Sequence, residues 1–282
     1  RTRTYENDLH TAKHISEGLG EYKMSQINCN VLKSFINSFT LKTYKRGKRD
    51  CYYGASAINK VYVLLSNAIL LAAEENLVEK NYMQFVKKPR TNSFQEFKEK
   101  ALSDTEIKLI LDAVQDQWIL NTWIHILLYT GVRPSEALAL KFNDISFKDK
   151  SISINKTLSY TQQLDEVTRK PVGPQIPIIT DLKNVRDNGQ INYQRRTLIV
   201  SDIVIDQIVK LYNYIESNRR ISEYRKQNGT QDFLFTGSRG NLWIYRYYAQ
   251  QYTRHLQKYQ INSSEYNLYR FRHNYCTRLL RI

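Results

Sequence analysis

The stretch YTGVRPSEALAL at residues 129–140 decides the fold, because it joins a buried helix to a second helix through a single arginine. The apolar run 118–129 predicts a core helix that Gly131 ends, and the proline that follows suits the first turn of the next helix. Arg133 stands at this junction, where the start of the next helix favours a bound anion. Glu136 follows one turn later and can hold the guanidinium in orientation. A buried Arg–Glu brace would explain the same pair without an anion, so this stretch alone leaves both interpretations open.

A second stretch, YRFRHNYCT at residues 269–277, places two arginines and a histidine within four positions at the start of an expected helix. Arg270 and Arg272 are two residues apart, so they face different sides of that helix and cannot easily enter one pocket. Taken alone, the stretch is typical of a basic surface helix. Together with residues 129–140, it forms a combination that chance hardly explains.

The net charge indicates a polyanionic partner. The 282 residues include 42 Lys and Arg against 27 Asp and Glu, which gives a formal net charge of +15. Residues 1–100 hold 17 basic and 10 acidic side chains and the remainder holds 25 and 17, so the excess is spread over both halves. Ribosomal, membrane-surface and merely basic proteins share this feature. The usual partner is nucleic acid, and we expect both halves to face it.

Cysteine and histidine usage gives no sign of a metal site. Cys29, Cys51 and Cys276 are widely spaced and form no C-x-x-C pair, which argues against a disulfide framework or a zinc site and favours a reducing compartment. The five histidines are scattered without a metal-binding pattern. The sequence shows no apolar run near 18 residues and no signal peptide. We therefore expect a cytoplasmic protein with no metal, no cofactor and no membrane partner.

Hydrophobic periodicity predicts a helical domain over residues 1–88, without evident strands. Its long helix from Ser56 to Glu75 carries an apolar stripe made of Ile58, Val61, Tyr62, Leu65, Ile69 and Ala72. The basic stretch 42–49 is expected to be a flexible link, either a solvated loop or a phosphate-contacting one. A linker over residues 89–100 follows.

Residues 101–282 predict a second domain of mixed type. A capping box of Ser103 and Glu106 opens its first helix. Short strands are expected around 145–160 and 197–200, with a long polar excursion between them, and helices follow to the end.

The two arginine stretches resemble the motifs T-G-x-R-x-x-E-x-x-x-L and H-x-x-R-H of the tyrosine recombinase, or phage integrase, family. The resemblance extends over essentially the whole chain, including the E-x-x-L-V-x-K-N run at residues 74–81. It is closest in character to integrases of phages and conjugative transposons of Gram-positive bacteria. It implies an all-α, SAM-like core-binding domain, then a mixed α+β catalytic domain with a small antiparallel sheet, together forming a C-shaped clamp around a duplex.

The resemblance also implies roles for particular residues. Arg133 and Arg272 would hold the two non-bridging oxygens of the scissile phosphate, where negative charge gathers as phosphorus becomes pentavalent. Glu136 would support Arg133, and His273 would be the histidine that follows the second arginine. Tyr269 stands where the family has a histidine; it can donate a hydrogen bond, but it cannot take up a proton near pH 7.

A catalytic lysine is expected in the excursion between the strands, as general acid toward the leaving 5′-oxygen. Lys183 is the preferred candidate, with Lys170 and Lys156 as alternatives. The DNA-contacting candidates lie in the first domain and the linker: Lys45, Arg46, Lys48, Arg49, Lys60, Asn67, Lys87, Lys88 and Arg90.

The reaction implied by the resemblance is strand exchange through a 3′-phosphotyrosine link, on double-stranded DNA in the bacterial cytoplasm, associated with the nucleoid. It implies a homodimer on one site and a tetramer in the synaptic complex. The family's nucleophilic tyrosine would follow Ile282, so we expect this chain to bind DNA without cleaving it. Two alternatives remain: a cleavage-inactive DNA-binding relative or fragment, and a type IB topoisomerase-like enzyme, which would relax DNA without a paired site.

Overall fold

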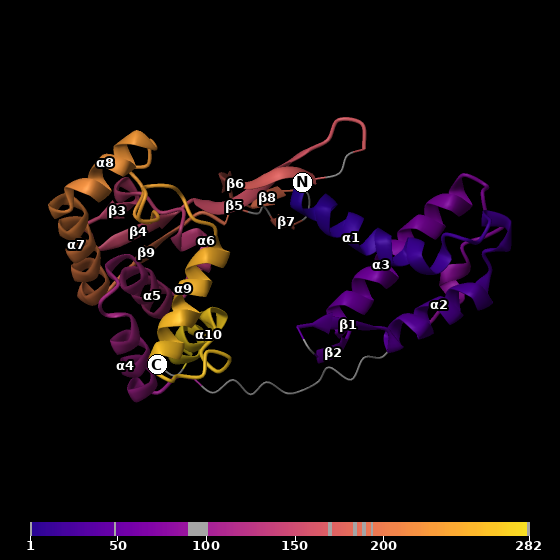
Figure 1. Cartoon of the computed structure of the whole chain (residues 1–282), viewed down its shortest axis with the longest axis horizontal. Helices are drawn as coiled ribbons and strands as arrows, with labels where there is room; N and C mark the ends of the chain where they lie inside the picture. Colours follow the sequence, from indigo (N-terminus) through magenta and orange to yellow (C-terminus); the bar gives the residue numbers. More distant parts are fainter. Residues whose placement is uncertain are drawn as a thin grey trace. The chain divides into compact units, whose positions relative to one another are not determined.

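The structure, a computed structural model, describes residues 2–47, 49–89, 101–168, 171–182, 185–187, 190–192 and 194–280. The chain divides into two compact units, residues 1–97 and 98–282 (Figure 1). The division falls inside the linker predicted for residues 89–100, of which only the first residue is among those described.

The N-terminal unit is predominantly helical, as predicted. It contains α1 (Thr2–Leu19), η1 (Met24–Gln26), α2 (Cys29–Leu41), α3 (Ala55–Glu74) and η2 (Tyr82–Phe85). Asn28 caps α2 because its side-chain oxygen accepts the backbone N–H groups of Asn30 and Val31. α3 is, within the described part of the chain, the one helix long and apolar enough to cross a membrane. Its predicted stripe is nevertheless buried except for the half-buried Tyr62, and α3 packs on α1 and α2, so it serves as the core helix of this unit.

The basic stretch of this unit is a β-hairpin, so the expectation of a flexible link without strands was wrong there. β1 (Thr43–Arg46) pairs with β2 (Arg49–Tyr52) in an antiparallel register that sets Tyr44 opposite Cys51. Gly47 has φ +65°, which a tight hairpin turn requires and glycine adopts without strain. Threonine and tyrosine favour strands, and this preference outweighs the run of charges.

The C-terminal unit surrounds the buried helix α5 (Trp118–Thr130). α5 packs on α4 (Asp104–Val114), α7 (Asp202–Ser217), α9 (Tyr245–Lys258) and α10 (Leu268–Leu279), and α8 (Arg219–Gln227) packs on α7. The predicted capping box is present: Ser103 Oγ accepts the Glu106 N–H at 3.2 Å, and Glu106 Oε2 accepts the Ser103 N–H at 2.7 Å. The mixed α+β class of this unit is confirmed.

A small antiparallel sheet lies beside these helices. It consists of β3 (Ile145–Ser146), β4 (Ser151–Ile154) and β9 (Arg196–Ile199), in the order β3-β4-β9. The excursion before β9 is itself folded: β5 (Lys156–Leu164) and β6 (Pro171–Asp181) form a long hairpin that extends from the helical body, and β7 (Val185–Asp187) pairs with β8 (Gln190–Asn192) (Figure 1). β9 therefore brings the far end of the excursion back to the sheet.

Candidate functional site

The site is built around the glycine that ends α5. Gly131 has φ +60°, and its N–H donates to the Leu127 carbonyl at 3.2 Å. A Cβ on this residue would lie 2.4 Å from Cδ1 of Tyr275, so both the backbone conformation and the packing require glycine here. The chain turns at this point and sets Arg133 before α6 (Pro134–Ala137). The helix expected after Arg133 is present, but it has only four residues, so its N-terminus adds little to anion binding.

Arg133 is held by the buried carboxylate of Glu136. The Arg133 side chain is 47% exposed, whereas that of Glu136 is 2% exposed. Arg133 Nη1 donates to Glu136 Oε1 at 2.9 Å, and the Arg133 backbone N–H donates to Oε2 at 3.0 Å. A third donor comes from β9, where Arg196 Nη2 lies 2.5 Å from Glu136 Oε2. The brace expected between Arg133 and Glu136 is thus present, and it includes a second arginine.

Two opposing effects act on the pKa of Glu136. Burial raises it, while the hydrogen bonds from Arg196 and Arg133 lower it more, so the pKa of this carboxyl lies below its usual value. Glu136 is therefore an anion at neutral pH that accepts from two guanidinium groups.

Arg272 reaches the same turn from the other end of the unit. Its Nη1 donates to the Gly131 carbonyl oxygen at 2.7 Å, so the two arginine stretches meet. Arg270 lies elsewhere: it donates to the Glu265 carbonyl at 2.8 Å and pairs with Glu106 at 3.6 Å. We call Arg133 and Arg272 the arginine pair. Within the described residues, Nε and Nη2 of each have no hydrogen-bond partner, so each guanidinium keeps donors for an oxyanion.

Tyr269 and His273 lie on α10 on either side of Arg272 in sequence. Tyr269 is 57% exposed, and His273 is also exposed. Neither side chain bonds to the arginine pair in the part of the chain that the structure describes. Tyr245 of α9 lies near Tyr269; burial, and then the charge of Tyr269, raise the pKa of Tyr245. Tyr245 was not among the predicted site residues.

Of the three candidates for the catalytic lysine, one lies among the described residues. Lys183 and the alternative Lys170 lie outside the described residues. Lys156, the other alternative, forms an ion pair with Asp144, in which Nζ lies 2.7 Å from Oδ1 and 2.5 Å from Oδ2. The side chains of Lys156 and Asp144 are 18% and 9% exposed. A paired and largely buried amine is poorly suited to deliver a proton to a leaving oxygen.

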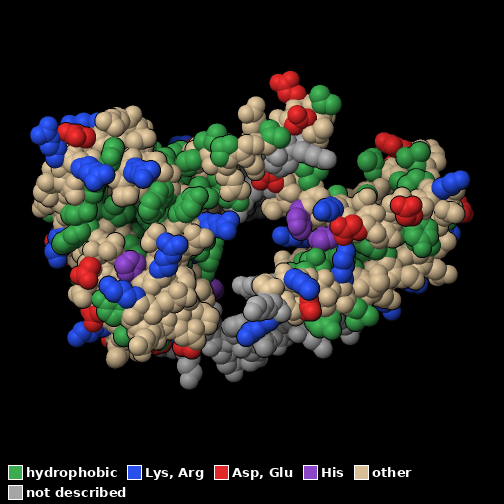
Figure 2. All heavy atoms as spheres, in the orientation of Figure 1, with side chains coloured by type: hydrophobic (Ala, Val, Ile, Leu, Met, Phe, Trp, Pro, Cys, Tyr) green, Lys and Arg blue, Asp and Glu red, His purple; other side chains and the backbone are tan. Residues whose placement is uncertain are grey.

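The predicted DNA-contacting residues of the first unit occupy several elements. Lys45 and Arg49 are exposed on the hairpin, Lys60 and Asn67 are exposed on α3, and Lys87 and Lys88 are exposed after η2. Lys48, Arg90 and the side chain of Arg46 lie outside what the structure describes. Lys and Arg side chains appear on the surfaces of both units (Figure 2).

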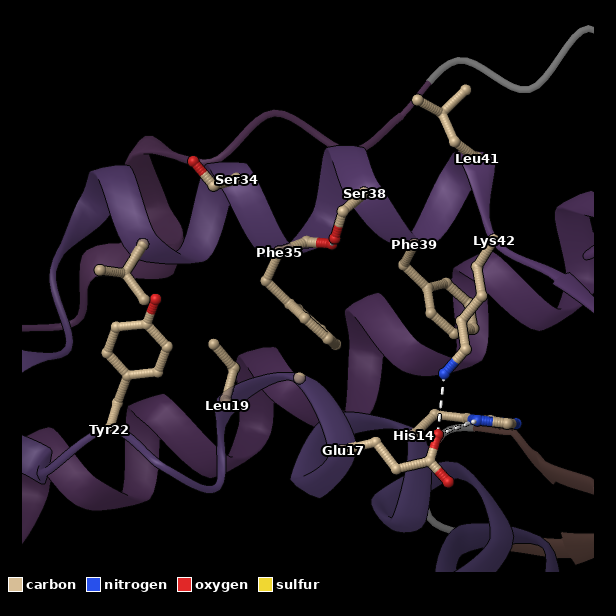
Figure 3. Close-up of a pocket in the computed structure, with 12 residues that line it drawn as sticks. His14, Glu17, Leu19, Tyr22, Ser34, Phe35, Ser38, Phe39, Leu41 and Lys42 are labelled. Carbon is tan, nitrogen blue, oxygen red and sulfur yellow. Dashed lines mark hydrogen bonds and ion pairs between the residues drawn. The ribbon is translucent and has the colours of Figure 1, made fainter.

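A cavity of about 560 Å³ lies between α1 and α2, away from the arginine pair in sequence and in a different unit (Figure 3). Phe35 and Phe39 form part of its apolar wall. Lys42, at one end, already pairs with Glu17 at 2.8 Å. This cavity has no free cation suited to a phosphate among its described lining residues, so it is not the reaction site.

Comparison with known proteins agrees with the fold and the motifs. Two transposon integrase complexes from Tn1549 superpose on the chain: one with transposon right end DNA has a TM-score of 0.69 at 17% identity, covering 100% of this chain and 82% of that one. The other, with circular intermediate DNA, has a TM-score of 0.61 at 18% identity, covering 96% and 78%. A lambda integrase dimer bound to a COC′ core site gives 0.56 at 14% identity, covering 98% and 63%.

Identities this low show a shared fold only. Comparison with curated protein sequences found no match. The model of the phage integrase family matches residues 100–282, which include both arginine stretches and the strand that carries Arg196. The chain therefore belongs to the phage integrase family, that of the tyrosine recombinases.

Proposed function

We propose that this protein is a site-specific DNA recombinase that moves a phage or a conjugative transposon through a 3′-phosphotyrosine intermediate. The bond from Arg272 to the Gly131 carbonyl carries the proposal, because it brings arginines from the two motifs to one turn with donors left over. A pair of guanidinium groups suits the transition state of phosphodiester cleavage, where charge grows on the non-bridging oxygens.

In the proposed reaction a tyrosine hydroxyl gives its proton to a general base and its oxygen attacks phosphorus, so that an O–P bond forms and the bond to the 5′-oxygen breaks. The leaving oxygen takes a proton from a general acid, for which Lys183 remains our candidate. A 5′-hydroxyl of the partner strand then attacks the phosphotyrosine and releases the tyrosine. The covalent link keeps the energy of the broken bond, so strand joining needs neither ATP nor a metal ion.

The partner is double-stranded DNA, on which we propose a dimer at one site and a tetramer at synapsis, in the bacterial cytoplasm. Lambda integrase, which shares the fold, has been seen as a dimer on a core site and as a tetramer on a Holliday junction. We also propose that the attacking tyrosine is none of those within residues 1–282, so that this polypeptide alone binds without cleaving.

The test uses the full-length protein and a suicide duplex nicked beside the cleavage point, analysed on a denaturing gel. A covalent band, mapped to one tyrosine, together with joining to a second duplex, is the expected result. Covalent bands with relaxation of unpaired plasmid and no joining would indicate a topoisomerase. Specific binding without any covalent band would indicate a cleavage-inactive relative, an outcome that Tyr269 in place of the family's histidine makes worth testing.

A further inference from the structure

The carboxylate that holds Arg133 has a second cationic partner whose role in cleavage is unassigned. Arg196 lies sixty residues further along the chain, yet its Nη2 is 2.5 Å from Glu136 Oε2. We propose that Arg196 is a positioning residue for DNA cleavage, acting through Glu136 to fix the place and the effective charge of Arg133. The inference rests on the proposed function and names a residue of that same site.

The strand places Arg196 toward the site. Along residues 194–199 burial alternates with the period of a β-strand. Gln194, Arg196 and Leu198 are half-buried, while the three residues between and after them are exposed. Antiparallel pairing of Arg196 with Ile154 of β4 fixes this register, since a slip of one residue would turn the arginine to solvent. The orientation of Arg196 is therefore set by the sheet.

Charge explains why a second arginine is useful. Glu136 is 2% exposed, so its negative charge is poorly screened by water. With Arg133 as its only partner, the Glu136 carboxylate would offset the positive charge with which Arg133 binds the phosphate. Arg196 supplies a second positive charge, which leaves the group of three side chains with a net charge of +1. Arg133 can then stabilise an oxyanion while remaining anchored.

Gln194, which lies just before β9, also fixes the plane of the Arg133 guanidinium. Gln194 Oε1 accepts from Arg133 Nη1 at 3.2 Å, and Glu136 Oε1 accepts from the same nitrogen at 2.9 Å. Both hydrogens of Nη1 are thus directed to the protein, and Nη2 and Nε remain for the substrate. Arg196 shares Oε2 of Glu136 with the Arg133 backbone N–H, so loss of Arg196 would leave that oxygen with a single donor.

The test compares Arg196→Gln with Arg195→Gln in the full-length protein. Arg195 is the adjacent arginine, its side chain is 60% exposed and it pairs with Asp181 at 3.5 Å, so the two variants lose the same charge at neighbouring positions. Single-turnover cleavage of the suicide duplex is measured at saturating DNA. Arg196→Gln should cleave about 100-fold more slowly than wild type, as displacement of a catalytic group from its productive geometry predicts. Arg195→Gln should stay near the wild-type rate, and equal rates for the two variants would overturn the proposal.

A double-mutant cycle with Glu136→Gln separates positioning from direct contact with the phosphate. If Arg196 acts through Glu136, Arg196→Gln should cause little further loss in a Glu136→Gln background. Losses that multiply would instead mean that Arg196 contacts the DNA itself, and the positioning role would be wrong.

If Arg196→Gln does not fold, Arg196→Lys and Arg195→Lys replace the pair, and only Arg196→Lys should slow cleavage. Absence of cleavage by the wild type would refute the proposed function along with this inference, whereas normal wild-type cleavage with an inert Arg196 would refute the inference alone.

Discussion

Arg272 Nη1 donates to the carbonyl oxygen of Gly131 at 2.7 Å, a bond between residues 141 positions apart. The carbonyls at the end of a helix have no partner within it, so the last turn of α5 offers an acceptor that a distant cation can satisfy. The end of α5 thereby anchors Arg272, and the turn that follows it carries Arg133. This relationship makes Gly131 the residue at which the two arginine stretches meet.

Gly131→Ala should destabilise the C-terminal unit by about 3 kcal/mol, the sum of a left-handed backbone and a side-chain overlap. The φ of +60° disfavours alanine, and the new Cβ would meet the Tyr275 ring at 2.4 Å. Gly229→Ala is the matched control, because Gly229 has φ +64° with nothing within 4 Å of an added Cβ. It should lose only about 1–2 kcal/mol. Urea unfolding measures both, and equal losses would show that the Tyr275 packing is unimportant.

Glu136→Gln should lower the free energy of unfolding at neutral pH by about 2 kcal/mol, since it removes charged hydrogen bonds from Arg133 and Arg196. Burial raises the pKa of Glu136, but the two arginines outweigh it and the net shift is downward. A carboxyl with a depressed folded-state pKa stabilises the protein above its unfolded pKa, and this contribution is lost as pH falls through the folded value.

The stability of the wild type should therefore fall on acidification more steeply than that of Glu136→Gln. Urea midpoints measured from neutral pH to below the ordinary pKa of glutamate, about 4.3, provide the comparison. Glu223→Gln is the control, because Glu223 is 53% exposed in its pair with Arg219 and should change little at any pH. Parallel pH curves for wild type and Glu136→Gln would contradict the view that Glu136 is ionised and paired.

The sequence predicted the parts of the site that depend on local order. The turn at Gly131, the Arg133–Glu136 pair and the capping box at Ser103 each lie within a few residues, where helix periodicity and capping chemistry act. The helical first unit and the small sheet also follow from periodicity. In contrast, the hairpin at residues 43–52 was missed, because a run of charges suggests solvent while threonine, tyrosine and glycine decide the backbone.

Arg196 was missed for a different reason. Its partner is sixty residues away, and neither position alone identifies the other. One signal was present. Arg196 directly precedes the strand predicted near 197–200 and shares a face with Leu198, and an arginine that faces inward needs a buried acceptor. The excursion likewise looked polar and irregular, yet its first part folds into the hairpin of β5 and β6, because its isoleucines and valines favour strands even between charged turns.

Arg133→Ala should abolish cleavage by the full-length protein while leaving site-specific binding within about tenfold of wild type. In the proposed reaction Arg133 contacts one phosphate among the many that DNA binding involves, but it does so where new charge develops in the transition state. Gel-shift affinities and suicide-duplex cleavage on the same preparation measure the two effects. Cleavage at close to the wild-type rate would remove Arg133 from the catalytic role.

Simultaneous replacement of Lys45 and Arg49 by alanine should give the opposite pattern. These side chains are exposed on the β1–β2 hairpin, and we predict that they bind backbone phosphates. Affinity should fall more than for Arg133→Ala, and the slope of log K against log salt should shrink by about 0.9 for each phosphate that is no longer neutralised. Arg219→Ala, which removes a side chain that is 92% exposed on α8, is the control for the loss of one positive charge from the surface. An unchanged salt slope in the double variant would place the hairpin away from DNA.

The polypeptide of residues 1–282 should bind a duplex site without forming a covalent adduct, whereas the full-length protein should form one. An arginine pair lowers the barrier only for a nucleophile held in line with the leaving oxygen. Two tyrosines of this unit are engaged in packing: the Tyr275 ring contacts Gly131, and Tyr245 packs against Trp123, where burial raises the pKa of Tyr245 and makes it harder to ionise.

Tyr269 is the described tyrosine that most resembles a rival nucleophile, since it is 57% exposed and stands one helical turn before Arg272. That position, in the family's motif, belongs to a histidine that assists the reaction, so we expect Tyr269 to donate a hydrogen bond rather than attack. The suicide duplex is incubated with residues 1–282, with the same polypeptide carrying Tyr269→Phe or Tyr275→Phe, and with the full-length protein. A covalent band from the shorter polypeptide that disappears in one phenylalanine variant would identify that tyrosine as the nucleophile. The order of catalytic groups inferred from the motifs would then be wrong, although DNA binding through both units could stand.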